Sequence, residues 1–88
     1  MTTKIKDIQY KKEFTYIVSF DDGIRGEIDF RPLLWGEAFE ELLDINAFKQ
    51  AFIDDITKTI TWPNGVDIAP ETLYKMVLSK NLQNNSSI

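Results

Sequence analysis

The chain of 88 residues contains no cysteine and no histidine. Without cysteine it can form neither disulfide bonds nor thiolate metal sites, which disfavours a small secreted scaffold. Without histidine it lacks the usual general base near neutral pH and the commonest metal ligand. Triads of the Ser-His-Asp or Cys-His kind are therefore excluded. We assign no catalytic residue, no metal ligand and no cofactor from the sequence.

Long apolar runs are also missing, since none exceeds a few residues, so the sequence predicts no transmembrane helix. Residues 1–7 lack the apolar stretch of a signal peptide. We therefore expect a cytoplasmic protein that makes no membrane contact. The length is that of one domain. We expect residues 1–80 to form it and residues 81–88, which hold an Asn-Asn-Ser-Ser run, to be a flexible tail.

The net charge of −4 is distributed unevenly along the chain. Residues 1–20 carry four lysines against two acids, and residues 56–88 carry three lysines against two acids. Between them, residues 21–55 carry ten acids against three basic residues. Nucleic-acid affinity rests largely on cationic contacts, so direct nucleic-acid binding is not expected. The acidic middle suits a basic protein partner, or simply solubility.

The first third of the chain has the alternation of apolar and polar residues that predicts β-strands. Two clear segments cover residues 14–20 and 24–30, and a weaker one covers residues 4–10. Ile5 is out of phase in the weaker segment, which indicates a bulge. Lysines are typical of edge strands, where they discourage sheet-to-sheet pairing. We interpret in this way the four lysines near the N-terminus, which are Lys4, Lys6, Lys11 and Lys12.

The turn between the two clear segments contains Asp22 and Gly23. A two-residue loop would set Phe20 opposite Arg25 and mix apolar with charged groups on one face. A three-residue loop sets Phe20 opposite Ile24 and keeps that face apolar. It also places Gly23 where a type I turn followed by a bulge needs a left-handed residue. The sequence therefore predicts the three-residue loop.

The pattern becomes helical after residue 30. Residues 31–35 predict a short turn with Pro32 at its first position and Gly36 as its stop. Helical spacing follows over residues 38–43, and Asp44 is the expected N-cap of a second short helix.

A second hairpin is expected from residues 52–54 and 59–62, followed by a turn and a short extended piece at residues 66–68. Pro70 then opens a C-terminal helix. The fold class is therefore α+β, with a three-strand antiparallel meander, two short helices, a second β-hairpin and a C-terminal helix.

Two strings of residues are more specific than the rest. The first runs from Phe20 through Asp22 and Gly23 to Asp29, where the Asp-Gly pair forms a turn and Asp29 caps the following turn. The second contains Trp62, Pro63, Asn64, Gly65, Asp67, Pro70 and Glu71. Its most direct interpretation is architectural. Trp62 supplies buried area, the next three residues turn the chain, Asp67 caps the C-terminal helix, and Glu71 favours the helix dipole.

These strings, with Phe39, Leu42 and Phe48 between them, resemble the bacterial domain-of-unknown-function family 2442 over about residues 5–78. The resemblance implies a small α+β domain. Some members carry an additional helix-turn-helix region, which this sequence does not continue into, so direct DNA binding is not expected. Some are encoded beside another small protein, which has prompted toxin–antitoxin proposals. The resemblance carries over no catalytic residue.

Three functional hypotheses remain open. The first is a non-enzymatic interaction module, an antitoxin-like or regulatory member of a small bacterial protein pair, whose partner is the product of a neighbouring gene. Its candidate interface is Trp35, Tyr74, Glu37, Glu40 and Glu41.

The alternative is an enzyme that depends on a small ligand or a divalent metal and uses a carboxylate cluster chosen from Asp21, Asp22, Asp29, Asp67 and Glu71. The third is a nucleic-acid accessory acting through the N-terminal lysines. Self-association as a homodimer is a further expectation.

Overall fold

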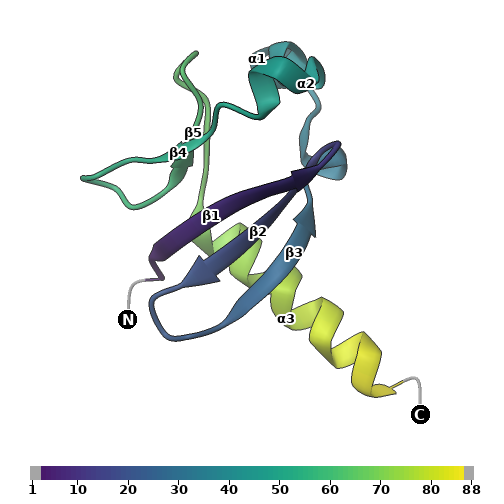
Figure 1. Ribbon diagram of the computed structural model, residues 1–88. Coiled ribbons are helices and arrows are strands. Elements are labelled where there is room, and N and C mark those ends of the chain that lie inside the picture. Colours follow the sequence, from purple (N-terminus) through teal and green to yellow (C-terminus); the bar gives the residue numbers. More distant parts are fainter. Residues whose placement is uncertain (1–2, 87–88) are drawn as a thin grey trace.

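The computed structural model describes residues 3–86, with the side chains of residues 3–80. Its first sheet contains β1 (Ile5–Lys12), β2 (Thr15–Phe20) and β3 (Arg25–Asp29) in the order β1-β2-β3. Both pairings are antiparallel. The three strands form the predicted meander, and the rest of the chain packs against its apolar face (Figure 1).

The turn between β2 and β3 has the predicted three-residue loop. The Phe20 amide donates to the Ile24 carbonyl over 2.8 Å, and Tyr16 pairs with Ile28 further along the ladder. Gly23 has a φ of +93°, the left-handed value that this loop needs. As a result, Tyr16, Phe20 and Ile28 are buried on one face of the sheet.

The bulge expected near Ile5 is also confirmed. Ile5 pairs with Phe20 and Asp7 pairs with Ser19, so one extra residue, Lys6, is accommodated in β1. This shift brings the Ile5 side chain into the core despite its position out of phase. A second irregularity lies near the other end of β1, between Tyr10 and Lys12.

The segment between the sheets consists of four short turns of helix, as the sequence predicts in outline. They are η1 (Arg31–Leu33), α1 (Glu37–Glu40), η2 (Glu41–Leu43) and α2 (Ile45–Phe48). Asp29 accepts the Arg31 amide over 2.9 Å at the start of η1, and Asp44 accepts the Asn46 amide over 3.0 Å at the start of α2. Both predicted caps are therefore present.

Two details of this segment differ from the expectations. Pro32 is the second residue of η1, since Arg31 is the first. Gly36 has a φ of +87° and immediately precedes α1, so it opens that helix as well as following the first turn. The chain reverses direction at Gly36 in a conformation that other residues rarely adopt.

The second sheet contains β4 (Phe52–Ile53), β5 (Ile60–Thr61) and β6 (Asp67–Ile68), again antiparallel and in sequence order. The predicted hairpin is the β4–β5 pair. The short extended piece expected at residues 66–68 belongs to this sheet as its third strand, because Ile60 pairs with Ile68.

The C-terminal helix, α3, covers Pro70–Ser86 and begins at the predicted residue. Its helical backbone continues six residues beyond the expected domain boundary at residue 80; residues 87 and 88 of the expected tail lie outside the described residues, and the tail's flexibility stays a prediction. Within residues 3–86, no helix is long and apolar enough to cross a lipid bilayer.

The predicted cap by Asp67 is not observed. Within residues 3–80, no hydrogen bond involves the Asp67 carboxylate, and the side chain is exposed. The reason is the pairing of β6 with β5. Successive side chains of a strand point to opposite faces, so Asp67 points outward because its neighbour Ile68 is buried. Glu71 does lie in the first turn of α3, as expected.

Glycine at position 26 allows α3 to pack closely on β3. A Cβ atom built on Gly26 would lie 2.9 Å from Cγ1 of Val77, which is closer than side chains approach in real structures. Val77 is buried on α3, and Gly26 lies on the apolar face of β3. The missing side chain therefore sets the distance between this helix and the sheet.

Substitution of Gly26 tests this packing. Gly26→Ala should lower the free energy of unfolding by about 1–3 kcal/mol, because the added methyl overpacks the contact with Val77. In the background of Val77→Ala the same change should cost much less, since the two clashing methyl groups are gone. Equal costs in both backgrounds, measured by urea unfolding, would show that Val77 does not limit the contact.

Candidate interaction surface

The most exposed tryptophan of the protein is Trp35, with 76% of its surface accessible. The residue before it, Leu34, is buried, and the residue after it is Gly36. Leu34 therefore fixes the chain to the core while the turn at Gly36 directs it away, which leaves the indole between them in solvent. Within residues 3–80, no hydrogen bond uses the indole N–H of Trp35.

Trp35 borders a hollow of about 400 Å³, which we call the Trp35 hollow. Its walls come from η1, α1 and β6, three segments that are separated in the sequence. The lining residues are Leu33, Trp35, Gly36, Glu37, Ala38, Phe39, Asp67 and Ile68. The lining is mainly apolar, with one carboxylate on each side of it.

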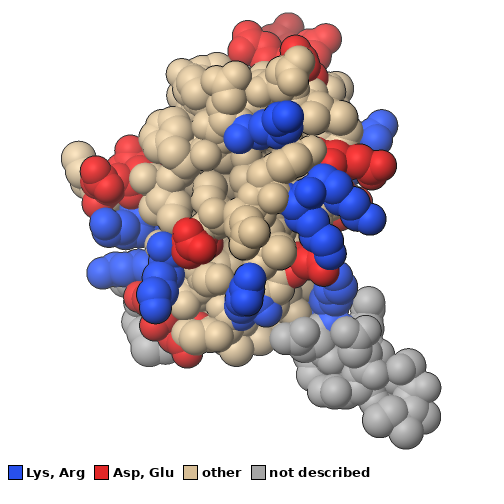
Figure 2. Space-filling model, in the orientation of Figure 1, with Lys and Arg blue, Asp and Glu red and all other residues tan. Residues whose placement is uncertain are grey.

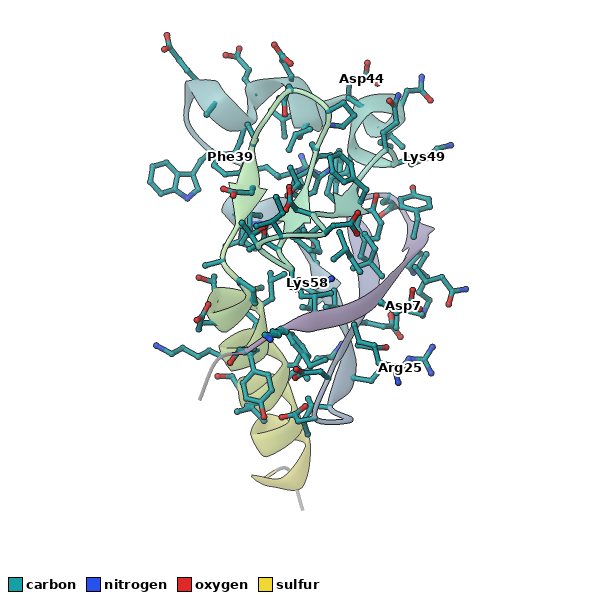
Figure 3. All side chains as sticks on the ribbon, turned by 90° about the vertical axis from the view of Figure 1, so that its left-hand side faces the viewer. Asp7, Arg25, Phe39, Asp44, Lys49 and Lys58 are labelled. Atoms are coloured by element: carbon teal, nitrogen blue, oxygen red, sulfur yellow. The ribbon has the colours of Figure 1, made fainter. Side chains whose placement is uncertain are left out.

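Acidic side chains surround this region. No lysine or arginine occurs between residues 32 and 48, where four acids lie. Glu37 lines the hollow, and Glu40 and Asp44 are exposed on the same run of short helices. Figure 2 shows carboxylates gathered at the top of the molecule, over α1 and η2. Phe39 and Asp44 lie at this end of the molecule, and Arg25 lies toward the other (Figure 3).

Glu41 points toward the second sheet. Its Oε2 accepts a hydrogen bond from Nδ2 of Asn64 over 3.2 Å. Both residues line a smaller hollow of about 140 Å³, at whose base lies Trp62. Of the three predicted interface glutamates, Glu37 therefore borders the Trp35 hollow, Glu40 is exposed beside it, and Glu41 contacts the Asn64 turn.

Tyr74, the second aromatic residue predicted for the interface, lies elsewhere. It is half-buried on α3, its ring packs edge-on against Phe20 at 5.0 Å, and its hydroxyl donates to Oδ2 of Asp22 over 2.5 Å. Tyr74 does not line the Trp35 hollow. The predicted interface residues are therefore divided among three places: the Trp35 hollow, the Asn64 turn and the contact of α3 with the β2–β3 turn.

The hydrogen bond from Tyr74 changes the acidity of both partners. Together with the Ile24 amide, which donates to Oδ1 over 3.0 Å, it holds the pKa of Asp22 below its ordinary value. The same bond raises the pKa of Tyr74, because the hydroxyl must give up its proton beside a carboxylate. Asp22 thus has a structural role, which links the β2–β3 turn to α3.

The two sequence motifs fold into turns of the same kind. At the second turn the Trp62 amide donates to the Val66 carbonyl over 2.9 Å, and Oδ1 of Asn64 accepts the Val66 amide over 3.1 Å. Asp22 and Ile24 are related in the same way in the first turn. Gly65 has a φ of +92°, matching Gly23. Pro63 precedes Asn64 at the exposed tip, and Trp62 is fully buried before the turn. The architectural interpretation of these residues agrees with this geometry.

The acids considered for a carboxylate cluster are on different elements. Asp21 and Asp22 lie in the β2–β3 turn, Asp29 ends β3, Asp67 is in β6 and Glu71 is in α3. Among the side chains that the structure describes, no three acids lie close enough together to hold a metal ion. Asp29 and Asp22 accept backbone amides instead.

Sequence reasoning identified Trp35 and Glu37 but missed the other walls of the hollow. Leu33, Phe39 and Ile68 have no exposed or charged character that marks them in the sequence. Their shared position arises because β6 and η1 meet, a contact between residues more than thirty positions apart. No local pattern carries that information.

Comparison with known proteins gives one match. The model of a family described as "Protein of unknown function (DUF2442)" matches residues 5–78. No curated protein and no solved structure matches the chain.

The pairing of Asp22 with Tyr74 predicts a pH dependence. Because the pKa of Asp22 is lowered in the folded protein, the stabilisation from its charged form is present above the ordinary aspartate pKa. It is lost as the pH falls through the lowered pKa.

Tyr74→Phe should raise the pKa of Asp22 toward its ordinary value, measured by NMR titration of the carboxyl carbon. Tyr10→Phe is the control, since that hydroxyl donates to the Glu13 carbonyl instead. An unchanged Asp22 pKa in Tyr74→Phe would contradict this assignment.

Proposed function

Because the chain belongs to the DUF2442 family, whose description names no activity, we propose from its surface that it is a protein-interaction module. In this proposal the Trp35 hollow is its principal contact site. The module acts in the bacterial cytoplasm as the antitoxin-like or regulatory member of a small protein pair, and its partner is the product of a neighbouring gene.

The observation that carries the proposal is the exposure of Trp35 beside an apolar hollow. Tryptophan is enriched among the residues that dominate binding energy at protein interfaces, typically where it enters a desolvated pocket. A small domain that leaves this side chain in water forgoes the stabilisation that its burial would provide. Trp35 is not among the buried side chains that form the core.

The charges near the hollow indicate the chemistry of the partner. Glu37, Glu40 and Asp44 are exposed at this end of the molecule, where they outnumber the one labelled lysine, Lys49 (Figure 3). A partner that presents an apolar side chain between lysines or arginines would fill the hollow and meet the acids. Complementary charge of this kind mainly increases the rate of association and the specificity.

A carboxylate-dependent enzyme is the alternative function that the sequence left open. We do not propose it as a second function. Within residues 3–80 its candidate acids are separated, and two of them are engaged by backbone amides. Self-association through the Trp35 hollow is retained as an outcome of the experiment below.

Capture experiments with matched variants test the proposal. The tagged protein, Trp35→Ala and Ile56→Ala are each used to capture partners from lysate of the source organism, and the captured proteins are identified by mass spectrometry and sized. Ile56 is the matched control, because it is a large apolar residue, 91% exposed, in the loop between β4 and β5 and outside the hollow. Both variants should change the free energy of unfolding by less than about 0.5 kcal/mol, as exposed substitutions do.

We expect one stoichiometric small protein with the wild type and with Ile56→Ala, and at least about tenfold less of it with Trp35→Ala, the loss expected for a hot-spot tryptophan. Glu37→Lys combined with Glu40→Lys should also reduce capture, and more strongly at low salt. The proposal fails if the two single variants capture the same partner equally. It also fails if only the protein itself is recovered, as a monomer or as a homodimer.

A further inference from the structure

The two edges of the first sheet are protected to different extents. The β1 edge carries lysines and has a bulge or irregularity near each end. The second hairpin covers the start of β1, where the Ile5 amide donates to the Lys58 carbonyl over 3.2 Å. Figure 3 places Lys58 beside β1. The β3 edge has no bulge, no lysine and no proline within Arg25–Asp29, and β3 is hydrogen-bonded to a strand on one side only. Natural sheets usually protect such an edge.

The pairing with β2 determines which backbone groups of β3 face outward. The Ile24 carbonyl accepts the Phe20 amide, and the Phe30 amide donates to the Phe14 carbonyl, so both residues face the β2 side. Hydrogen-bonded and non-hydrogen-bonded pairs alternate along an antiparallel ladder, so Gly26 and Ile28 also face β2. The N–H and C=O groups of Arg25, Glu27 and Asp29 therefore point away from the sheet, toward its free edge.

A groove of about 550 Å³ runs beside this edge, between β3 and α3; we call it the β3 groove. Ile28, Pro32 and Met76 supply apolar walls, Lys75, Ser79 and Lys80 line the helix side, and Glu27 and Asp29 line the strand side. In Figure 1, α3 crosses β3 and continues past it, so the helix forms a ledge beyond the strand. A strand added to β3 would lie with one face of its side chains on this ledge.

We propose that the β3 groove binds an extended segment of a partner protein, which adds to β3 as a fourth strand. Among the side chains of this segment that face α3, an apolar one contacts Met76 and an acidic one pairs with Lys75 and Lys80. The outward N–H and C=O groups of Arg25, Glu27 and Asp29 form the backbone hydrogen bonds to the added strand. Strand addition of this kind takes affinity from backbone hydrogen bonds and specificity from alternate side chains.

The charges of the groove support an acidic segment. Glu27 is already paired with Lys11 on the outer face of the sheet, where the two side chains are 2.7 Å apart. This contact is the main reason that the pKa of Glu27 is lowered, and the nearby charges of Lys80 and Lys12 lower it further. No acid among the described residues is paired with Lys75 or Lys80 in the same way. The helix side of the groove therefore offers positive charge to an incoming carboxylate.

A second copy of the chain fits this edge less well than a partner segment does. Antiparallel pairing of two β3 strands would place a two-fold axis normal to the sheet at their shared edge. The two α3 helices would then lie on the same face of the joined sheet. Each helix extends past its own β3 edge, so the two helices would occupy the same space above the paired strands. Packed helices need axes about 8–10 Å apart, which neighbouring strands about 4.8 Å apart do not provide.

This inference is independent of the Trp35 hollow, which shares no lining residue with the groove. Either surface can fail its test without affecting the other. A partner with a basic apolar region and an acidic extended segment would use both surfaces.

The test uses an octapeptide with threonine at its odd positions and valine and glutamate in turn at its even positions, so that one face of the strand carries both, and the corresponding peptide with lysine in place of glutamate. Both peptides have acetylated and amidated ends. NMR of the full chain reports amide positions and hydrogen exchange. In the free protein, the amides of Arg25, Glu27 and Asp29 should exchange faster than those of Gly26 and Ile28. The glutamate peptide should shift and slow these three amides, and the lysine peptide should bind at least about tenfold more weakly.

Two sets of variants identify the contacts. Glu27→Pro removes an outward N–H but no bond to β2, and edge positions tolerate proline. Its matched control, Glu27→Ala, loses the same carboxylate and keeps the N–H. Glu27→Pro should bind the glutamate peptide at least about tenfold more weakly than Glu27→Ala does. This is the loss expected when one backbone hydrogen bond is deleted and the proline ring blocks the edge. Lys75→Glu with Lys80→Glu should reverse the preference between the two peptides, and this variant serves if Glu27→Pro does not fold.

Three results would overturn the proposal. The first is a glutamate peptide that leaves the three β3 amides unchanged. The second is a charge-reversed protein that keeps the original peptide preference. The third is a free protein that sediments as a dimer with these amides already protected, which would make a second copy the occupant of the edge.

Discussion

The carbonyl oxygen of Phe48 joins the two sheets of this protein. It accepts the hydroxyl of Tyr16, from β2, over 2.7 Å and the indole N–H of Trp62, which follows β5, over 2.9 Å. The Tyr16 hydroxyl in turn accepts the Ala51 amide over 3.2 Å. Burial raises the pKa of Tyr16 to about 12, so it remains a donor at physiological pH. A buried donor left without this acceptor would cost about 1–3 kcal/mol.

This junction also explains why short helices are stable here. α2 has four residues and could not form alone. It is held because the Phe48 ring is buried against aromatic side chains of both sheets, among them Tyr16, Phe30 and Trp62. The chain from η1 to α2 is therefore fixed at both ends, by β3 and by Phe48. Trp35 lies within this fixed segment, which presents its indole on a preorganised surface. Preorganisation lowers the entropic cost of binding.

The features that the sequence predicts correctly are local ones. The loop at Gly23 and the caps by Asp29 and Asp44 depend on residues within a few positions of each other. The sequence predicts an extended piece at residues 66–68 but does not reveal that it pairs with β5, and this pairing is what turns Asp67 away from the start of α3. The same holds for the walls of the Trp35 hollow and for the open edge of β3, which depend on how distant segments pack. The composition excludes histidine and cysteine chemistry.

The two tryptophans differ in role: Trp62 is buried and donates to the Phe48 carbonyl, whereas Trp35 is exposed, and we propose that it binds a partner. Acrylamide quenching of single-tryptophan variants tests this difference directly. Trp62→Phe removes the N–H that donates to Phe48, so its circular dichroism spectrum must first match that of the wild type. It then leaves Trp35, whose fluorescence should be quenched nearly as efficiently as that of free tryptophan, since most of its surface is accessible. Trp35→Phe leaves Trp62, which should be strongly protected because it is fully buried. A Trp35 that is protected in the isolated protein would contradict the account, because its surface would already be occupied.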